Sequence, residues 1–90
     1  IIDDGSHLPG HIVKTLKLYW PLLEPGGFYF IEDLRCTHNP NYSAPFPIDA
    51  ADKDRAPLVA MIDALLRNCD DGGEVESVQF WRELMVVRKK

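Results

Sequence analysis

The sequence predicts an α/β fold in which short strands, some of them parallel, alternate with helices. Two apolar segments, residues 1–2 and 28–31, are each followed directly by a pair of carboxylates. An open parallel sheet presents ligand-binding residues in this way, at the carboxyl ends of neighbouring strands. The stretch between these segments has apolar residues at helical spacing, and two further apolar segments near the C-terminus predict a hairpin. The chain is long enough for one small domain.

The first strand and the first helix are predicted from residues 1–23. The pair at 1–2 predicts the end of a buried strand, because the turn-forming run Asp-Asp-Gly-Ser follows it. Pro9 suits a first helical position, where its missing N–H is not needed. We expect a helix over about 9–23, with one apolar face that comprises Ile12, Leu16, Tyr19 or Trp20, and Leu23.

The second strand and a long connection follow. Residues 24–27, Glu-Pro-Gly-Gly, cannot continue a helix, and residues 28–31 are apolar throughout, which favours a strand buried on both faces. Residues 34–53 contain three prolines and no sustained periodicity, so they predict a long loop. Loops of this length in compact domains are often functional, and the position of this one directly after the carboxylates predicts a lid.

The last third of the chain predicts a helix and a hairpin. A proline near its start and Asp-Asp-Gly-Gly after its end bound a second helix over about 56–69. Residues 75–80 alternate in part and predict an edge strand, whereas residues 84–87 are apolar without interruption and predict a strand with neighbours on both sides. A tight turn near 81–83 is expected to join them.

Composition and charge exclude several classes of protein. With 46% hydrophobic and 27% charged residues, the chain has the composition of a globular domain. The net charge is −4 and the basic residues are scattered, apart from the cluster at 88–90, so no nucleic acid partner is expected. No apolar run approaches the ~20 residues of a membrane helix and no signal peptide is recognisable, so we expect a cytoplasmic protein without membrane attachment. Cys36 and Cys69 have no C-x-x-C spacing and are expected to be reduced thiols.

Three motifs carry a resemblance to a known family. The sequence PLLEPGGF at residues 21–28 is similar to the usual approach to the fifth strand of class I S-adenosylmethionine-dependent methyltransferases. The combination of IIDDGSH at 1–7 with IEDL at 31–34 resembles, more narrowly, the metal-dependent sugar O-methyltransferases that act on macrolide antibiotics and similar glycosides. Sequences described as cephalosporin hydroxylase-like share this combination. The segment 35–53 differs from the aromatic-rich stretch expected after Glu-Asp-Leu in this family, which leaves the acceptor open.

The resemblance implies a fold and a set of site residues. Residues 1–90 would form the C-terminal half of a methyltransferase domain, with strands four to seven of a Rossmann-like sheet, flanking helices and a C-terminal antiparallel hairpin. Asp4, Glu32 and Asp33 would be the ligands of Mg²⁺ or Mn²⁺. His7 would be the general base that takes the proton of a sugar hydroxyl in a small-molecule glycoside or macrolide substrate.

The resemblance also implies what the chain lacks. The first three strands of the family's sheet have no counterpart, and no G-x-G-x-x-G is present, so S-adenosylmethionine would be bound only by the full-length enzyme. The isolated chain is therefore expected to be inactive. Its strand at residues 1–2 would be an exposed apolar edge, through which we expect self-association.

Each candidate site residue has both a chemical and a structural explanation. Carboxylate oxygens are the ligands that Mg²⁺ prefers, and histidine titrates near neutrality as a general base should. Alternatively, Asp4 could cap its own turn, and His7 could be an ordinary loop histidine. Glu32 and Asp33 could be solvated residues at a strand end, but adjacent like charges repel unless something positive lies between them.

Further residues and functions remain open at this point. Asp3 is expected to be structural or a neighbour of the methyl donor. His11 is expected on the solvated face of the first helix, with a contact to the substrate as the alternative, and Tyr42 and Phe46 are expected either to line a sugar pocket or to anchor the lid. The main alternative function is a non-catalytic fragment or small partner-binding module that keeps the site residues. A third hypothesis takes His7, His11 and a carboxylate as the facial triad of a non-haem iron oxygenase.

Overall fold

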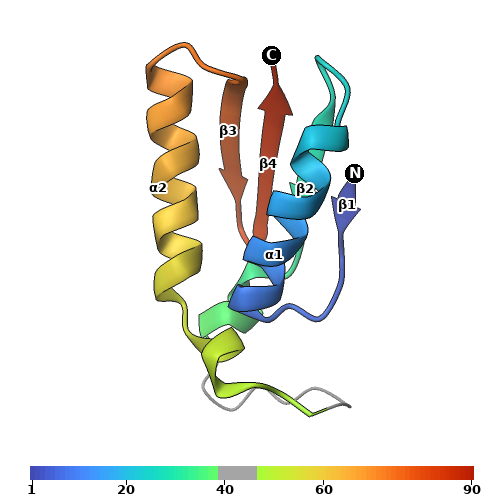
Figure 1. Cartoon of the computed structure of the whole chain (residues 1–90), viewed down its shortest axis with the longest axis vertical. Helices are drawn as coiled ribbons and strands as arrows, with labels where there is room; N and C mark the ends of the chain where they lie inside the picture. The colour runs from blue at the N-terminus through green and yellow to red at the C-terminus, as the bar shows by residue number, and fades with distance from the viewer. Residues whose placement is uncertain (39–46) are drawn as a thin grey trace.

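A four-stranded mixed sheet with two helices on one face forms the body of the protein in the computed structural model, which describes residues 1–38 and 47–90 (Figure 1). The strand order is β1-β2-β4-β3, with β1 parallel to β2 and with β4 antiparallel to both of its neighbours. This order confirms the α/β fold and the prediction that the last strand has neighbours on both sides. The strands are β1 (Ile2–Asp3), β2 (Phe28–Ile31), β3 (Val75–Trp81) and β4 (Leu84–Lys89).

The first helix, α1 (Pro9–Tyr19), is shorter than predicted because its expected last turn is a 3₁₀ turn, η1 (Trp20–Leu22). Pro21 has no N–H with which to bond the carbonyl four residues earlier, so the α-helix cannot continue through it. The second helix, α2 (Ala56–Asp70), agrees closely with its predicted span. Neither helix in the described ranges combines the length and apolar character that crossing a membrane requires.

The connection between β2 and α2 is not the featureless loop that the sequence predicts. It begins with a 3₁₀ turn, η2 (Leu34–His38), and ends with another, η3 (Ala50–Lys53). The carboxylate of Asp49 starts η3 by accepting a hydrogen bond of 3.0 Å from the N–H of Ala51. Such turns depend on bonds between residues two or three apart, so they leave no periodic pattern in the sequence. The centre of the predicted lid, at 39–46, lies outside the described residues.

The core lies between the sheet and the two helices. Tyr29 and Ile31 of β2 are fully buried, and they pair with Val87 and Met85 of β4 on the same face of the sheet. Side chains of the helices close this core, namely Ile12, Val13, Leu16 and Leu58. The prediction that β2 is buried on both faces is wrong within the described residues, because both helices cover the same face and Phe28 on the other face is 44% exposed.

Two turns at the ends of the sheet require left-handed backbone. Gly26, with φ of 80°, turns the chain into β2, and its N–H bonds the carbonyl of Lys89 at 2.9 Å. At the opposite end of the hairpin, Glu83 has φ of 67° in the two-residue turn between β3 and β4. The hairpin confirms the predicted roles of β3 as the edge strand and β4 as the central one.

Asp52 of η3 binds the end of the connection between β2 and α2 to the first helix, α1. Its Oδ1 accepts a hydrogen bond of 2.8 Å from Lys14 Nζ, and its Oδ2 lies 3.1 Å from His11 Nε2. The ammonium of Lys14, by this hydrogen bond, lowers the pKa of Asp52 below its ordinary value of 3.8. The negative charge of Asp52 therefore helps to hold η3 against the helix.

We predict that Asp52→Asn destabilises the fold at neutral pH and that the loss disappears in acid. Because the folded-state pKa is lowered, ionised Asp52 stabilises the fold above its ordinary pKa of 3.8, and this contribution is lost as the pH falls through the folded-state pKa. Thermal melts of both proteins between about pH 7 and about pH 2 measure the difference. Asp63→Asn is the control, since it removes an exposed carboxylate paired with Arg67 and should matter little. Equal losses at both ends of the pH range would contradict this account.

Candidate metal centre

The candidate site lies where two parallel strands end side by side. Ile2 pairs with Phe30 and Asp3 with Ile31, and the N–H of Glu32 donates a hydrogen bond of 3.0 Å to the carbonyl of Asp3. The two loops that follow these strands therefore leave the sheet at the same edge. This confirms the prediction that the strands before the two carboxylate pairs are neighbours.

Three of the predicted residues come together at this edge. One ligand atom each from Asp4, His7 and Asp33 lies within 4.8 Å of the others, which makes this a possible metal-binding group in the described part of the chain. His7 Nε2 lies 3.3 Å from Asp33 Oδ2 and 3.8 Å from Asp4 Oδ1. The side chain of His7 is 21% exposed, whereas both carboxylates are about half exposed. The group is thus open to solvent on one side, as binding of a metal and a substrate requires.

Left-handed backbone directs two members of the group. His7 has φ of 62° and Asp33 has φ of 57°, in a region of backbone conformation that residues other than glycine rarely adopt. Such residues cost about 1–3 kcal/mol each and persist only where the surroundings hold them, most often at functional sites. Without these two turns, the chain would leave β1 and β2 in an extended direction. The convergence of His7 and Asp33 therefore depends on locally strained backbone.

Glu32 does not belong to the group that the described geometry brings together. It is half-buried and follows the last residue of β2 directly, whereas Asp33 is turned by its left-handed backbone. The carboxylate of Glu32 is thus not among the ligand atoms that lie within 4.8 Å of one another. A role of Glu32 as a metal ligand stays a prediction.

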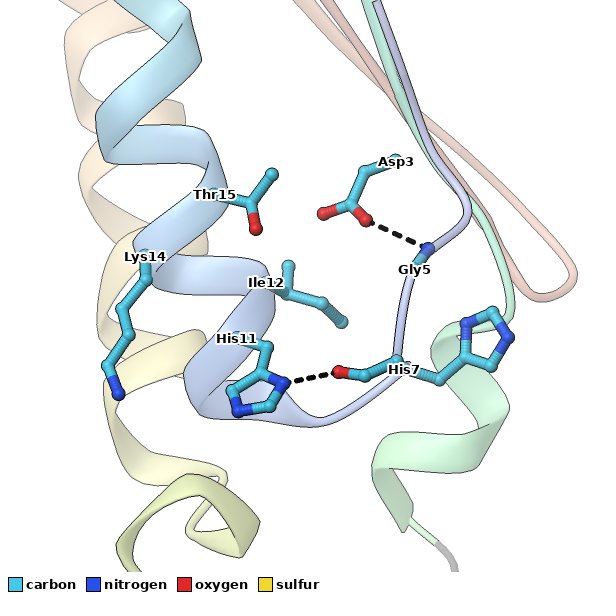
Figure 2. A pocket seen from close by; sticks show the side chains of 8 residues that line it. Asp3, Gly5, His7, His11, Ile12, Lys14 and Thr15 are labelled. Carbon is cyan, nitrogen blue, oxygen red and sulfur yellow. Dashed lines mark hydrogen bonds between the residues drawn. The ribbon is translucent and has the colours of Figure 1, made fainter. Parts of the chain in front are cut away.

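Asp3 lies next to the group but outside it. Its Oδ1 accepts a hydrogen bond of 3.2 Å from the N–H of Gly5, which Figure 2 shows, and its Oδ2 is buried without a partner among the described residues. Burial raises the pKa of this carboxyl. The hydroxyl of Tyr29 is likewise buried without a partner there, and burial, with the charge of Asp3, raises its pKa to about 12. Asp3 and Tyr29 both line a cavity of about 540 Å³ beside β1.

The sequence predicts that His11 lies on the solvated face of α1. In the structure, His11 is instead half-buried against η3. Its Nδ1 lies 2.6 Å from the hydroxyl of Ser6, and its Nε2 contacts Asp52. Figure 2 shows the rings of His7 and His11 pointing in different directions, and His11 is not in the candidate metal group. A facial triad of both histidines with a carboxylate is therefore contradicted.

Sequence reasoning missed Ser6 and Asp52. Ser6 lies in the motif IIDDGSH, but nothing in its spacing indicates a contact with His11. Asp52 lies 41 residues from His11 in the sequence, and no local pattern links positions so far apart. Tyr42 and Phe46, the predicted aromatic residues of the lid, lie outside the described residues.

Comparison with known proteins supports the resemblance. No protein-family model matches the chain. It is 39% identical over 49 residues to the 8-demethyl-8-alpha-L-rhamnosyl tetracenomycin-C 2'-O-methyltransferase of Streptomyces olivaceus, covering 54% of this chain and 13% of that protein. It is 32% identical over 66 residues to the mycinamicin VI 2''-O-methyltransferase of Micromonospora griseorubida, covering 72% of this chain and 16% of that protein.

Solved structures give the same result. The MycE methyltransferase from the mycinamycin biosynthetic pathway, in complex with Mg and SAH, is 27% identical with a TM-score of 0.67, covering 98% of this chain and 24% of that chain. A complex of the same enzyme with Mg, SAH and mycinamycin VI is 25% identical with a TM-score of 0.67 and covers 25% of that chain. The chain thus spans a quarter or less of the length of these proteins. The predicted similarity to sugar and macrolide O-methyltransferases is confirmed.

We predict that Asp33→Asn weakens Mn²⁺ binding at least about tenfold, because loss of even an outer partner of a metal ligand costs about 10–100-fold in affinity. Glu32→Gln, measured beside it, tests the residue that lies outside the group. Electron paramagnetic resonance of free Mn²⁺ gives both affinities. Asp63→Asn is the control, because this exposed carboxylate is paired with Arg67. Unchanged binding in Asp33→Asn would remove this residue from the site.

Proposed function

We propose that this chain supplies the metal ligands and the catalytic base of an S-adenosylmethionine-dependent O-methyltransferase that methylates a sugar hydroxyl of a glycosylated natural product. The observation that carries the proposal is the convergence of Asp4, His7 and Asp33 at the ends of two parallel strands. The names of the similar proteins support it, because they are sugar or macrolide O-methyltransferases. The Mg and SAH in the MycE complexes support the same cofactors here.

The chemistry divides among few residues. Asp4 and Asp33 would hold Mg²⁺ or Mn²⁺, with Glu32 as the predicted third carboxylate. The residues fit such an ion because carboxylate oxygens are the ligands it prefers and because Asp4 and Asp33 lie close together. Such an ion supplies Lewis acidity that lowers the pKa of a bound hydroxyl. His7 accepts the hydroxyl proton on a ring nitrogen. The Asp33 carboxylate, 3.3 Å from His7 Nε2, orients the ring and stabilises its positive charge.

Methyl transfer then needs a donor placed in line with the activated oxygen. The sugar oxygen forms a bond to the methyl carbon as the carbon–sulfur bond breaks, and the sulfur keeps the electron pair. We propose that residues 1–90 are the C-terminal half of the catalytic domain and that the donor is bound largely by other parts of the protein. The strand order β1-β2-β4-β3 and the short span relative to MycE support this division.

The acceptor is proposed to be a small-molecule glycoside or macrolide in the cytoplasm. Leu34 directly follows Asp33 and lines a cavity of about 410 Å³ together with Phe80 and Trp81. Both aromatic side chains are more than half exposed. Because their exposed rings are available to apolar ligand atoms, we place the aglycone of the acceptor against them.

The alternative function is a non-catalytic fragment, or a small partner-binding module, that keeps the site residues. Binding of a partner makes no use of a pair of carboxylates beside an imidazole in strained backbone, whereas metal-assisted proton transfer uses both. We therefore favour catalysis.

In the full-length protein, Asp33→Asn should abolish metal-dependent turnover. His7→Ala should lower kcat by about 10²–10⁴-fold, the usual contribution of a general base, with little change in donor affinity. Turnover with S-adenosylmethionine and a glycosylated acceptor, together with calorimetry of S-adenosylhomocysteine binding, measures both quantities. Asp63→Asn should retain full activity. Unchanged turnover in the Asp33 and His7 variants would refute the proposed mechanism.

We also predict that the isolated 90 residues self-associate through the edge of β1. Ile1 and Ile2 are 41% and 68% exposed, and an unpaired apolar strand edge templates pairing with other chains. Ile2→Lys should suppress association, whereas Leu22→Lys should not, because Leu22 is 72% exposed but belongs to η1 and not to a strand of the sheet. Light scattering across a concentration series measures this. A monodisperse monomer of the unmodified chain at high concentration would contradict the prediction.

A further inference from the structure

A chain of polar contacts runs from α1 to the loop that carries His7. The hydroxyl of Ser6 lies 2.6 Å from Nδ1 of His11. The Nε2 of the same ring lies 3.1 Å from Asp52 Oδ2, and the other oxygen of Asp52 accepts a hydrogen bond of 2.8 Å from Lys14. Both nitrogens of the His11 ring are therefore engaged, one on the side of the candidate metal centre and one on the side of η3.

The backbone is shaped to admit Asp52 at this point. Asp52 is only 8% exposed although it carries a charge. A Cβ at Gly10 would lie 2.7 Å from the Cα of Asp52, so only glycine allows η3 to approach α1 this closely. Because a charged residue is rarely buried to this extent unless it is paired, the contact of Asp52 with His11 and Lys14 is a specific feature of the fold.

The other end of this series of contacts is Ser6, beside the left-handed backbone of His7. Ser6 directly precedes His7, whose φ of 62° is costly for a residue with a Cβ. The Ser6 hydroxyl also accepts a hydrogen bond of 3.4 Å from the N–H of Leu8, on the other side of His7. Leu8 is 2% exposed, which fixes the far side of the corner in the core. The backbone on both sides of His7 is thus held through one hydroxyl.

We propose that Ser6, His11 and Asp52 are positioning residues for His7, an inference that rests on the proposed function of His7 as the base. Asp52 holds the ring of His11, His11 holds the hydroxyl of Ser6, and Ser6 holds the left-handed turn that aims the imidazole of His7 at Asp4 and Asp33. Because Asp52 stands at the end of the connection between β2 and α2, the docking of that connection on α1 and the aim of the base are coupled.

Two substitutions of His11 separate the two links. In His11→Gln, the amide nitrogen reaches the position of Nε2 and keeps the contact with Asp52, but the contact with Ser6 is lost. In His11→Asn, the side-chain oxygen reaches the position of Nδ1 and keeps the contact with Ser6. We expect His11→Gln to lower kcat of the full-length protein by up to about 10²-fold with acceptor KM unchanged, because small misplacements of catalytic groups cost this much. His11→Asn, which keeps the contact with Ser6 but loses the contact with Asp52, should lower kcat by a smaller factor than His11→Gln does.

Ser6→Ala and a surface control complete the kinetic test. Ser6→Ala should lower kcat as much as His11→Gln does, and the double variant should be no slower than either single one, since both break the same contact. Lys17→Gln, an exposed position in the last turn of α1, should change nothing. All rates are compared well below the melting temperature of each variant, so that a loss of stability alone does not lower them.

A second readout does not depend on activity. The chain has three histidines, so a His7→Ala sample assigns the imidazole nitrogen resonances of His7 in NMR spectra of ¹⁵N-labelled protein. We expect these resonances to shift in His11→Gln and Ser6→Ala. Unchanged kcat and unchanged His7 resonances in both variants would overturn the proposal. If the protein shows no methyltransferase activity but the His7 resonances shift, the proposed function fails while the positioning role stands.

Discussion

The parallel pairing of β1 with β2 is the interaction on which the site depends. β1 contains two residues, and it is held by the hydrogen bonds that the N–H groups of Phe30 and Glu32 donate to the carbonyls of Ile1 and Asp3. β2 is fixed in turn by its antiparallel pairing with β4. A shift of β1 by one residue would turn each of its side chains to the opposite face of the sheet. The C-terminal hairpin therefore contributes to the geometry of a site to which its own residues give no ligand.

At the site, buried residues stand next to residues with left-handed backbone. Tyr29 and Ile31 anchor β2 in the core, whereas Asp33, two residues beyond, already has left-handed backbone. His7 is in the same situation before the buried start of α1. Strain persists only where the surrounding structure stabilises it, and in both loops the buried residues lie within two positions of the strained one. The placement of the site at strand ends is thus a consequence of packing as well as of topology.

Much of the fold could be predicted because its causes are local. Prolines mark the start of both helices, Gly26 makes the turn before β2, and the unbroken apolar run of β4 marks a central strand. The site could be predicted only in part. Residue types and motif resemblance indicate Asp4, His7 and Asp33, but no spacing rule gives the left-handed backbone of His7 and Asp33 or leaves Glu32 out of the group. The contact of His11 with Asp52 depends on the close approach of two segments, which only the folded chain creates.

His7 lies between two carboxylates, and this position is compatible with both metal binding and general-base action. Asp4 and Asp33 lie close enough to repel each other, and the imidazole lies between them at 3.8 and 3.3 Å. A divalent cation bound by the two carboxylates would neutralise this repulsion. His7 would keep its contact with Asp33, which orients the ring while it accepts the proton of a substrate hydroxyl. Metal binding and general-base action are therefore compatible in this group.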